Sequence, residues 1–130
     1  VSAMTICVRR VSTAFGLLLL ATSAAHAAGA LAVGACVATA PQFNSRTVDE
    51  ARAQALKKCT AAGAKECRVV ATTRQGCIAH VIDVEDRCRV NDAYAAGRFL
   101  ELPINDALGK CEAAGGKRCR VVAAFCDTSG

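Results

Sequence analysis

The chain lacks tryptophan, and its 130 residues include only one tyrosine and four phenylalanines. Its core must therefore be built from alanine, valine, leucine and isoleucine, which bury little apolar area per side chain. At about 25 cal/mol per Å² of buried area, such a core leaves a small surplus over the conformational entropy that folding removes. The composition predicts a fold that needs cross-links in addition to hydrophobic burial.

Long apolar runs are also scarce, and the main one lies near the N-terminus at residues 11–22. Arg9 and Arg10 precede this run and Ala25-His26-Ala27 follows it, which is the order of a bacterial signal peptide. The run is shorter than the roughly 20 apolar residues that a membrane-spanning helix needs. We therefore expect a signal peptide at residues 1–27, cleavage after Ala27, export to the periplasm or the medium, and no membrane span.

The sequence has no C-x-x-C pair, which disfavours a zinc knuckle, yet cysteine itself is abundant. Of nine cysteines, Cys7 belongs to the expected signal peptide, which leaves eight. An even number in a short exported chain is typical of a disulfide framework, because disulfides persist in oxidising compartments. The cysteines expected to form disulfides are Cys36, Cys59, Cys67, Cys77, Cys88, Cys111, Cys119 and Cys126.

An internal repeat at an offset of 52 residues dominates the rest of the chain. Residues 55–71 recur as residues 107–123, with 13 identities at 17 positions and no gap. The same offset aligns Cys36 with Cys88, and a three-residue deletion aligns Cys77 with Cys126. We therefore predict two tandem modules that together form one compact domain, with acidic residues 83–86 at the junction. The modules are residues 28–81 and 82–130.

Each module carries signals for one helix and several strands. Thr47 and Glu50 form a capping box, apolar residues then recur at three- and four-residue spacing, and Gly63 ends the pattern. The expected fold class is α+β, with two ββαβ-like modules packed face to face about a pseudo-twofold axis and stapled by disulfides. Strands are predicted from β-branched runs at residues 67–73 and 119–125 and from apolar stretches at 30–39 and 76–84.

The cysteine positions favour two local disulfides, because one cysteine of each pair lies on the last helical turn and the other begins the next strand. These local pairs are Cys59–Cys67 and Cys111–Cys119. The other four cysteines could pair within the modules or across them. Cross pairs would join positions that the repeat makes equivalent, and they are Cys36–Cys88 and Cys77–Cys126.

A helix ending in Ala-Leu-x-Lys-Cys, followed by Cys-Arg-Val-Val and a further Cys-x-Ala, resembles the exported domain-of-unknown-function family 4189. The second module resembles the family's repeat of that pattern, and Cys36 and Cys88 are additions to it. The resemblance implies a secreted or periplasmic protein, and it carries over no established activity and no catalytic residue. The matching residues are 29–32, 51–59, 67–70 and 76–79.

Few side chains are candidates for chemistry. His80 is the only histidine after residue 27, and with Cys77 it could form a nucleophile, although an exported cysteine is usually oxidised. Asp83, Glu85 and Asp86 could hold calcium, but they lack the spacing of a calcium loop, which favours a solvated linker. We therefore expect no catalytic residue, no metal and no cofactor.

Residues 33–36, Val-Gly-Ala-Cys, loosely resemble a lipobox, which would make Cys36 a lipid anchor. The apolar run of the signal peptide ends too far upstream for this arrangement, and Cys36 aligns with Cys88 in the repeat. Disulfide pairing is therefore the preferred interpretation of Cys36.

The net charge is modest, because removal of Arg9 and Arg10 leaves 14 basic against 11 acidic residues, or +3. Basic residues recur at equivalent points of both modules and form a possible binding face, although a solvated charged surface would explain them too. Such a face suits a protein partner or an anionic envelope polymer, while the low charge and few aromatics disfavour nucleic acid. The residues of this basic face are Lys65, Arg68, Lys117, Arg118 and Arg120.

Three classes of function remain open. An exported binding or interaction module is preferred, because a rigid, cross-linked scaffold with a basic face suits a protein or envelope partner. A small enzyme acting on the envelope would need a pocket with paired carboxylates, and no such pair is evident in the sequence. A purely structural or stress-related secreted protein would need no partner.

Overall fold

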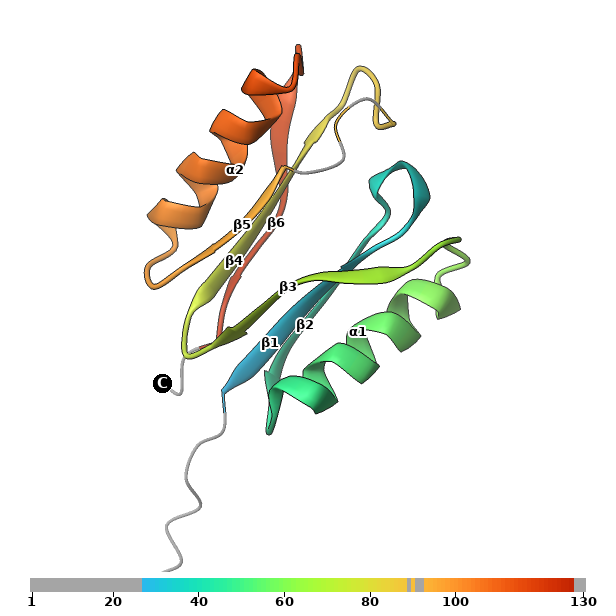
Figure 1. Cartoon of the computed structure of the whole chain (residues 1–130), viewed down its shortest axis with the longest axis vertical. Coiled ribbons are helices and arrows are strands. Elements are labelled where there is room, and N and C mark those ends of the chain that lie inside the picture. Colours follow the sequence, from blue (N-terminus) through green and yellow to red (C-terminus); the bar gives the residue numbers. More distant parts are fainter. Residues whose placement is uncertain (1–26, 89, 91–92, 128–130) are drawn as a thin grey trace, which may run out of the picture.

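The computed structural model describes residues 27–88, 90 and 93–127, and within them the fold is mixed α+β (Figure 1). The predicted signal peptide lies outside the described residues, except for Ala27. Six strands form two antiparallel three-stranded sheets in the described part of the chain, in the orders β2-β1-β3 and β5-β4-β6. The elements are β1 (Ala28–Val33), the short 3-10 helix η1 (Ala35–Val37), β2 (Thr39–Ser45), α1 (Val48–Ala61), β3 (Arg68–Arg74), β4 (Cys77–Asp83), β5 (Tyr94–Gly97), α2 (Glu101–Ala113) and β6 (Cys119–Cys126).

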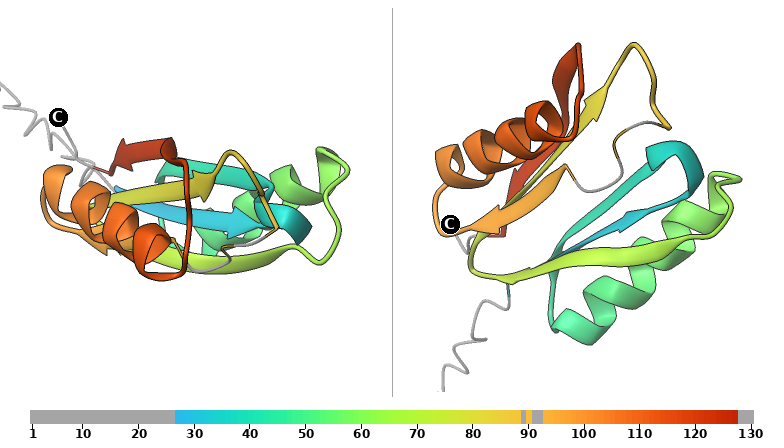
Figure 2. Two further views of the ribbon diagram at one scale, coloured as in Figure 1. Left: turned by 90° about the horizontal axis from the view of Figure 1, so that it is seen from above. Right: turned by 45° about the horizontal axis from the view of Figure 1, so that its top comes forward.

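The two sheets lie face to face, and each is covered on its outer face by one helix, α1 on the first sheet and α2 on the second (Figures 1 and 2). This layering follows from the alternation of side chains along the central strands. On β1, Ala30 and Ala32 pack beneath α1, whereas Leu31 and Val33 face the other sheet. On β4, residues at 79 and 81 pack beneath α2 and Ile78 faces the first sheet. The residues under both helices are mostly alanine, so the core buries little apolar area per side chain, as the composition predicts.

The boundaries of α1 match its sequence signals. Thr47 Oγ1 accepts a hydrogen bond from Glu50 N at 3.0 Å, and Glu50 Oε2 accepts one from Arg46 N at 3.2 Å. The helix ends where Gly63 adopts a left-handed backbone, with φ of +84°. In the described part of the chain, no helix has the length and apolarity that crossing a membrane would require.

Both sheets carry a register shift at the same place, between the central strand and the last strand. The register shifts between Leu31 and Ala32 in β1, and between His80 and Val81 in β4. Leu31 stands opposite Ala71, and His80 stands opposite residue 123. The last strands of the two sheets therefore correspond at an offset of 52 residues, whereas the central strands correspond at 49.

This register corrects two sequence-based interpretations. The predicted boundary between residues 81 and 82 falls inside β4, and acidic residues 83–86 begin the connection from β4 to β5 rather than joining two modules. Cys77 lies opposite Cys126 within one sheet, while Ala28 lies opposite Arg74 at the matching place in the other. Cys77 and Cys126 are therefore not repeat counterparts, because the register aligns Cys77 with Ala28 and Cys126 with Arg74.

Four disulfides join the eight described cysteines. The two local bridges are confirmed, and each spans eight residues between the end of a helix and the start of the next strand. Cys36–Cys88 links η1 to the β4–β5 connection and so ties the two sheets' loops together, whereas Cys77–Cys126 staples the ends of neighbouring strands in the second sheet. The sequence left the pairing of these last four cysteines open, and of the alternatives the structure has Cys36–Cys88 and Cys77–Cys126, although Cys77–Cys126 does not cross between the sheets.

Two polar contacts also join the sheets. Thr39 Oγ1 on β2 lies 2.9 Å from His80 Nδ1 on β4. Asp127, just beyond β6, accepts a hydrogen bond from Asn44 N through Oδ1 at 2.7 Å. Both His80 and Asp127 are buried, so these contacts specify how one sheet sits on the other.

Candidate functional site

The five residues of the basic face lie at the two connections between a helix and the last strand of its sheet. Lys65 lies in the α1–β3 connection and Arg68 begins β3, while residues 117 and 118 lie in the α2–β6 connection and residue 120 lies near the start of β6. All five are exposed. In Figure 1 the α2–β6 connection lies at the top and the α1–β3 connection at the right. The basic face is thus spread over two loops, and a binding role for it stays a prediction.

Asp83, the first calcium candidate, instead organises one of these loops. Its Oδ1 accepts hydrogen bonds from Glu85 N at 3.0 Å and Arg118 N at 3.2 Å, and its Oδ2 accepts one from Lys117 N at 3.2 Å. The side chain is buried, so these backbone donors satisfy a carboxylate that burial would otherwise penalise. Asp83 therefore holds the backbone of Lys117 and Arg118 in place.

Cys77 and His80 do not form a nucleophile and base in this fold. The Cys77 sulfur is bonded to Cys126, so it is no thiol. His80 is only 1% exposed and lies between the sheets against Thr39, and its Nε2 has no hydrogen-bond partner among the described residues. Burial lowers the pKa of His80 from 6.5 to about 4, so the ring is neutral at pH 7.

A concavity of about 550 Å³ lies where the end of β3 and the β3–β4 turn meet the end of β5. We call it the dibasic concavity, because Arg74 and Arg98 both line it. Its other polar side chains are two threonine hydroxyls and one amide, and no carboxylate is among the lining residues. The lining residues are Thr72, Thr73, Arg74, Gln75, Gly76, Ala96, Gly97 and Arg98.

The backbone beneath this concavity is pinned from several sides. Gln75 N donates to Ala27 O at 3.1 Å, and Gly76 O accepts from Asp127 N at 2.6 Å. The next residue, Cys77, carries the disulfide to the end of β6. A Cβ atom on Gly76 would lie 3.0 Å from Gly97 O, so glycine lets the turn and β5 approach closely. The two arginines therefore project from a rigid base.

Two exposed apolar residues adjoin lining residues of the dibasic concavity, Phe99 next to Arg98 in the chain and Leu102 beside Gly97, and we call this pair its apolar rim. Phe99 is 63% exposed and Leu102, in the first turn of α2, is 57% exposed. The guanidinium carbon of Arg98 lies 6.0 Å from the centroid of the Phe99 ring, which is within cation–π range. Exposed aromatic and aliphatic side chains beside arginine are typical of protein-binding surfaces.

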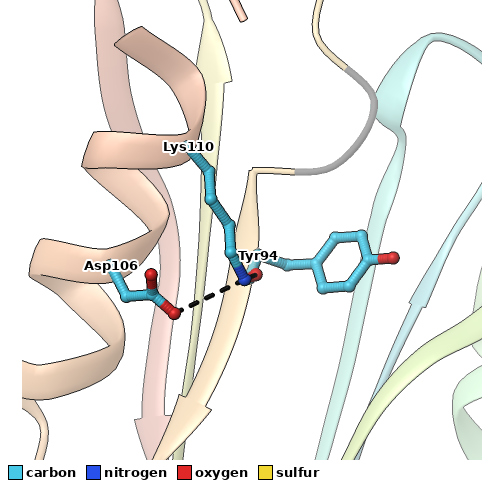
Figure 3. A network of polar contacts seen from close by, with 3 residues as sticks. All are labelled: Tyr94, Asp106 and Lys110. Atoms are coloured by element: carbon cyan, nitrogen blue, oxygen red, sulfur yellow. Dashed lines mark hydrogen bonds and ion pairs between the residues drawn. The ribbon is translucent and has the colours of Figure 1, made fainter. Parts of the chain in front are cut away.

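Lys110 covers part of the outer edge of β5, at the start of that strand. Its Nζ donates to the Tyr94 carbonyl oxygen at 3.0 Å and pairs with Asp106 at 3.4 Å, as Figure 3 shows. The Tyr94 ring points away from α2, toward the first sheet (Figure 3). Lys58 makes the matching contact in the other half, to Pro41 O at 3.4 Å. Such lysines occupy strand edges, which disfavours addition of a further strand there.

A second concavity, of about 520 Å³, surrounds the Cys36–Cys88 disulfide, and we call it the disulfide concavity. Arg68 of the basic face lines it together with Glu66, Gly34 and Ala35. Cys36 is bonded to Cys88, so the lipid attachment that residues 33–36 suggested has no free sulfur to use in this fold.

Sequence reasoning missed the dibasic concavity for an identifiable reason. Arg74 and Arg98 lie outside the repeated segments 55–71 and 107–123, and 24 positions separate them in the chain. They line one concavity because β3 contacts β5 when the sheets stack. The local sequence signal that could have indicated this site was an aromatic residue, Phe99, directly after Arg98.

Comparison with known proteins agrees with the sequence pattern. The family model described as "Domain of unknown function (DUF4189)" matches residues 28–126, which span both sheets and both helices. No curated protein and no solved structure matches the chain. The chain therefore belongs to the DUF4189 family, a family of domains of unknown function.

Proposed function

We propose that the protein is an exported binding module without catalytic activity, which holds an acidic segment of a partner protein in the dibasic concavity. The observation that carries this proposal is the convergence of Arg74 and Arg98 on a concavity whose lining includes no carboxylate. Guanidinium groups bind carboxylates through paired, charge-assisted hydrogen bonds, and the flanking threonine hydroxyls add further donors.

The apolar rim supports a protein partner over a bare polyanion. Phe99 and Leu102 expose more than half of their surface beside Arg98, and an anionic polymer would leave that apolar area in water. A segment that alternates acidic and apolar side chains would cover the rim and pair with both arginines. Aromatic residues and arginine also dominate the binding energy of known protein interfaces.

The cross-linked scaffold supports binding in another way. The Cys77–Cys126 disulfide and the contacts of Gln75 and Gly76 hold the base of the concavity before any ligand arrives. A preorganised site loses less conformational entropy on binding than a flexible one. Four disulfides in a chain of this size also support export, because such bonds persist outside reducing compartments.

We further infer that the two halves derive from one ββαβ module and are related by a pseudo-twofold axis. The repeat in sequence, the matching strand orders and the matching register shifts after Leu31 and His80 support this origin. The dibasic concavity breaks the symmetry, since Arg74 corresponds in register to Cys126. A site that is present once, and is built from both halves, fits a function that arose after the duplication.

The test is a titration followed by amide chemical shifts. The probe is a synthetic capped hexapeptide of alternating glutamate and leucine, and its control has lysine in place of glutamate. We expect the acidic peptide alone to shift amides at residues 72–76 and 97–99. Arg74→Ala or Arg98→Ala should weaken binding about tenfold or more, because each removes a charge-assisted contact of about 1.5 to 3 kcal/mol.

Arg52→Ala is the matched control, because Arg52 is an exposed arginine on α1, outside the concavity. The Arg52→Ala variant should bind the acidic peptide with the same affinity as the unaltered protein. Shifts confined to residues 117–120 would move the site to the basic face. Equal shifts with both peptides, or none with either, would refute the proposal.

A further inference from the structure

The Cys36–Cys88 disulfide differs from the other three in its accessibility. Both of its residues are exposed. Each of the other three disulfides has one cysteine that is at most 2% exposed, namely Cys59, Cys77 or Cys111. A thiolate must reach a disulfide sulfur to attack it, so exposure selects the bond that can react in the folded protein.

The disulfide concavity gives such a reactant room to enter. Both cysteines line this space of about 520 Å³, and the charged groups that line it with them are Arg68 and Glu66. A neighbouring cation lowers the pKa of a thiol and stabilises the thiolate that leaves when a disulfide is cleaved. Arg68 is placed to do this, while Glu66 partly offsets its charge.

The backbone around Cys36 is held in a costly conformation. Cys36 and Val37 have φ values of +53° and +54°, in the left-handed region that side chains with a Cβ rarely adopt, and β-branched valine least of all. The loop is pressed against the α1–β3 connection, where Ala35 N donates to Lys65 O at 2.8 Å. A Cβ on Gly34 would lie 2.7 Å from the Ala64 Cβ. Cleaving the disulfide would free one end of this loop.

We propose that Cys36–Cys88 is a thiol–disulfide exchange site that reacts with the paired thiols of an extracytoplasmic dithiol protein. One thiolate of the dithiol attacks one sulfur of the bridge, the bond between Cys36 and Cys88 breaks, and a mixed disulfide forms while the other cysteine leaves as a thiolate beside Arg68. The second thiol of the dithiol then attacks the mixed disulfide. Two electrons and two protons pass to Cys36 and Cys88, and the dithiol becomes a disulfide.

This exchange leaves the fold intact. The two sheets remain connected by the β3–β4 turn and share the core formed by Leu31, Val33 and Ile78. Cleavage therefore releases only the tie between η1 and the β4–β5 connection. The inference is independent of the dibasic concavity, which lies at the opposite end of β3.

Graded reduction of the native protein tests the proposal. The oxidised protein is incubated with increasing dithiothreitol without denaturant, quenched with N-ethylmaleimide, and mapped by peptide mass spectrometry. We expect Cys36 and Cys88 to be labelled at a reductant concentration at least tenfold below that needed for any other cysteine. At that point the circular dichroism spectrum should equal that of the oxidised protein.

Arg68→Gln tests the role of the cation, and Arg120→Gln is its matched control. Arg120 is the repeat counterpart of Arg68, is also exposed, and does not line the disulfide concavity. We expect Arg68→Gln to slow labelling of Cys36 and Cys88 several-fold and Arg120→Gln to leave the rate unchanged, with Arg68→Lys restoring it. Prior or simultaneous labelling of another pair in the unaltered protein would overturn the proposal. Equal labelling rates in Arg68→Gln and Arg120→Gln would show that Arg68 does not assist the exchange.

Discussion

Leu31 and His80 occupy the same place in the two sheets: each is the last residue of its central strand before the register shift against the last strand, and each lies opposite an alanine of that last strand. Both side chains point into the space between the sheets, where Leu31 packs in the shared core and His80 meets Thr39. The two residues show the cost of burying a polar side chain, rather than an apolar one, at this position. Leu31 is satisfied by apolar contact alone, whereas His80 buries an Nε2 without a hydrogen-bond partner among the described residues.

His80→Leu should therefore stabilise the protein. The change removes a buried ring nitrogen without a partner and adds apolar contact, which should raise the free energy of unfolding by about 1 to 2 kcal/mol. Thr39 keeps the Val37 carbonyl oxygen, 3.2 Å from its hydroxyl, as a partner. Urea unfolding at pH 7.5 measures the difference. The reciprocal change Leu31→His is the control and should destabilise the protein, and stabilisation by both would contradict the explanation.

The stability of the protein should fall with pH below about 6.5 because of His80. Burial lowers its pKa from 6.5 to about 4, so the unfolded chain binds a proton over a range in which the folded protein does not. Above pH 6.5 the ring is neutral in both states, so it does not reduce the free energy of unfolding. As the pH falls from 6.5 toward 4, protonation of the unfolded chain lowers the free energy of unfolding by about 3 kcal/mol at most. Urea unfolding between pH 7.5 and 4 measures this slope.

Asp127 acts in the opposite direction, and a variant separates the two groups. Burial raises the pKa of Asp127 even though its bond from Asn44 N opposes the shift, so protonation of Asp127 favours the folded state as pH falls. His80→Leu removes only the histidine contribution. The difference between the two proteins should therefore widen from pH 7.5 to pH 4, and a constant difference would refute the role of His80.

Much of the fold was predictable because its signals are local. Thr47 and Gly63 mark the limits of α1 within a residue or two, and the β-branched runs locate β3 and β6. The two local disulfides follow from the distance between a helix end and the next strand. Each of these features depends on residues that are close in the chain, where spacing and propensity decide the structure.

The register between distant strands was not predictable in the same way. Aligning Cys77 with Cys126 in the sequence required a three-residue deletion from the second half, before Cys126. In the structure the second half instead has three more residues than the first between its central strand and its helix, and Cys77 is a cross-strand neighbour of Cys126. The dibasic concavity depends on how β3 stacks on β5, and no pattern within either strand records that contact.

Removing the Cys77–Cys126 disulfide should destabilise the protein more than removing a local one. The bridge closes 49 residues, against eight for Cys59–Cys67, so it restricts the unfolded chain more. Loop-closure entropy predicts that Cys77→Ala with Cys126→Ala costs about 1.5 kcal/mol more than Cys59→Ala with Cys67→Ala. Guanidinium unfolding of both double variants measures this, and equal losses would show that packing rather than chain entropy sets the contribution.

Two glycines near α2 should respond in opposite ways to alanine. A Cβ on Gly97 would lie 2.9 Å from Pro103 Cδ and 3.1 Å from Leu102 Cβ, so Gly97→Ala must push the first turn of α2 away from β5. It should lower the free energy of unfolding by about 1 to 3 kcal/mol, as overpacking does, and weaken acidic-peptide binding because Arg98 follows directly. Gly109 lies in the exposed middle of α2, and a Cβ there would meet no atom within 4 Å.

Gly109→Ala should instead stabilise the protein by about 0.5 to 1 kcal/mol, because alanine loses less backbone entropy than glycine on entering a helix. Peptide affinity should be unchanged, since Gly109 does not line the dibasic concavity. Thermal unfolding and the peptide titration, run together on both variants, distinguish the two mechanisms. If Gly97→Ala were tolerated in both measurements, the close approach of β5 to α2 would not be what positions Arg98, and the rigid base argued for the concavity would lose one of its supports.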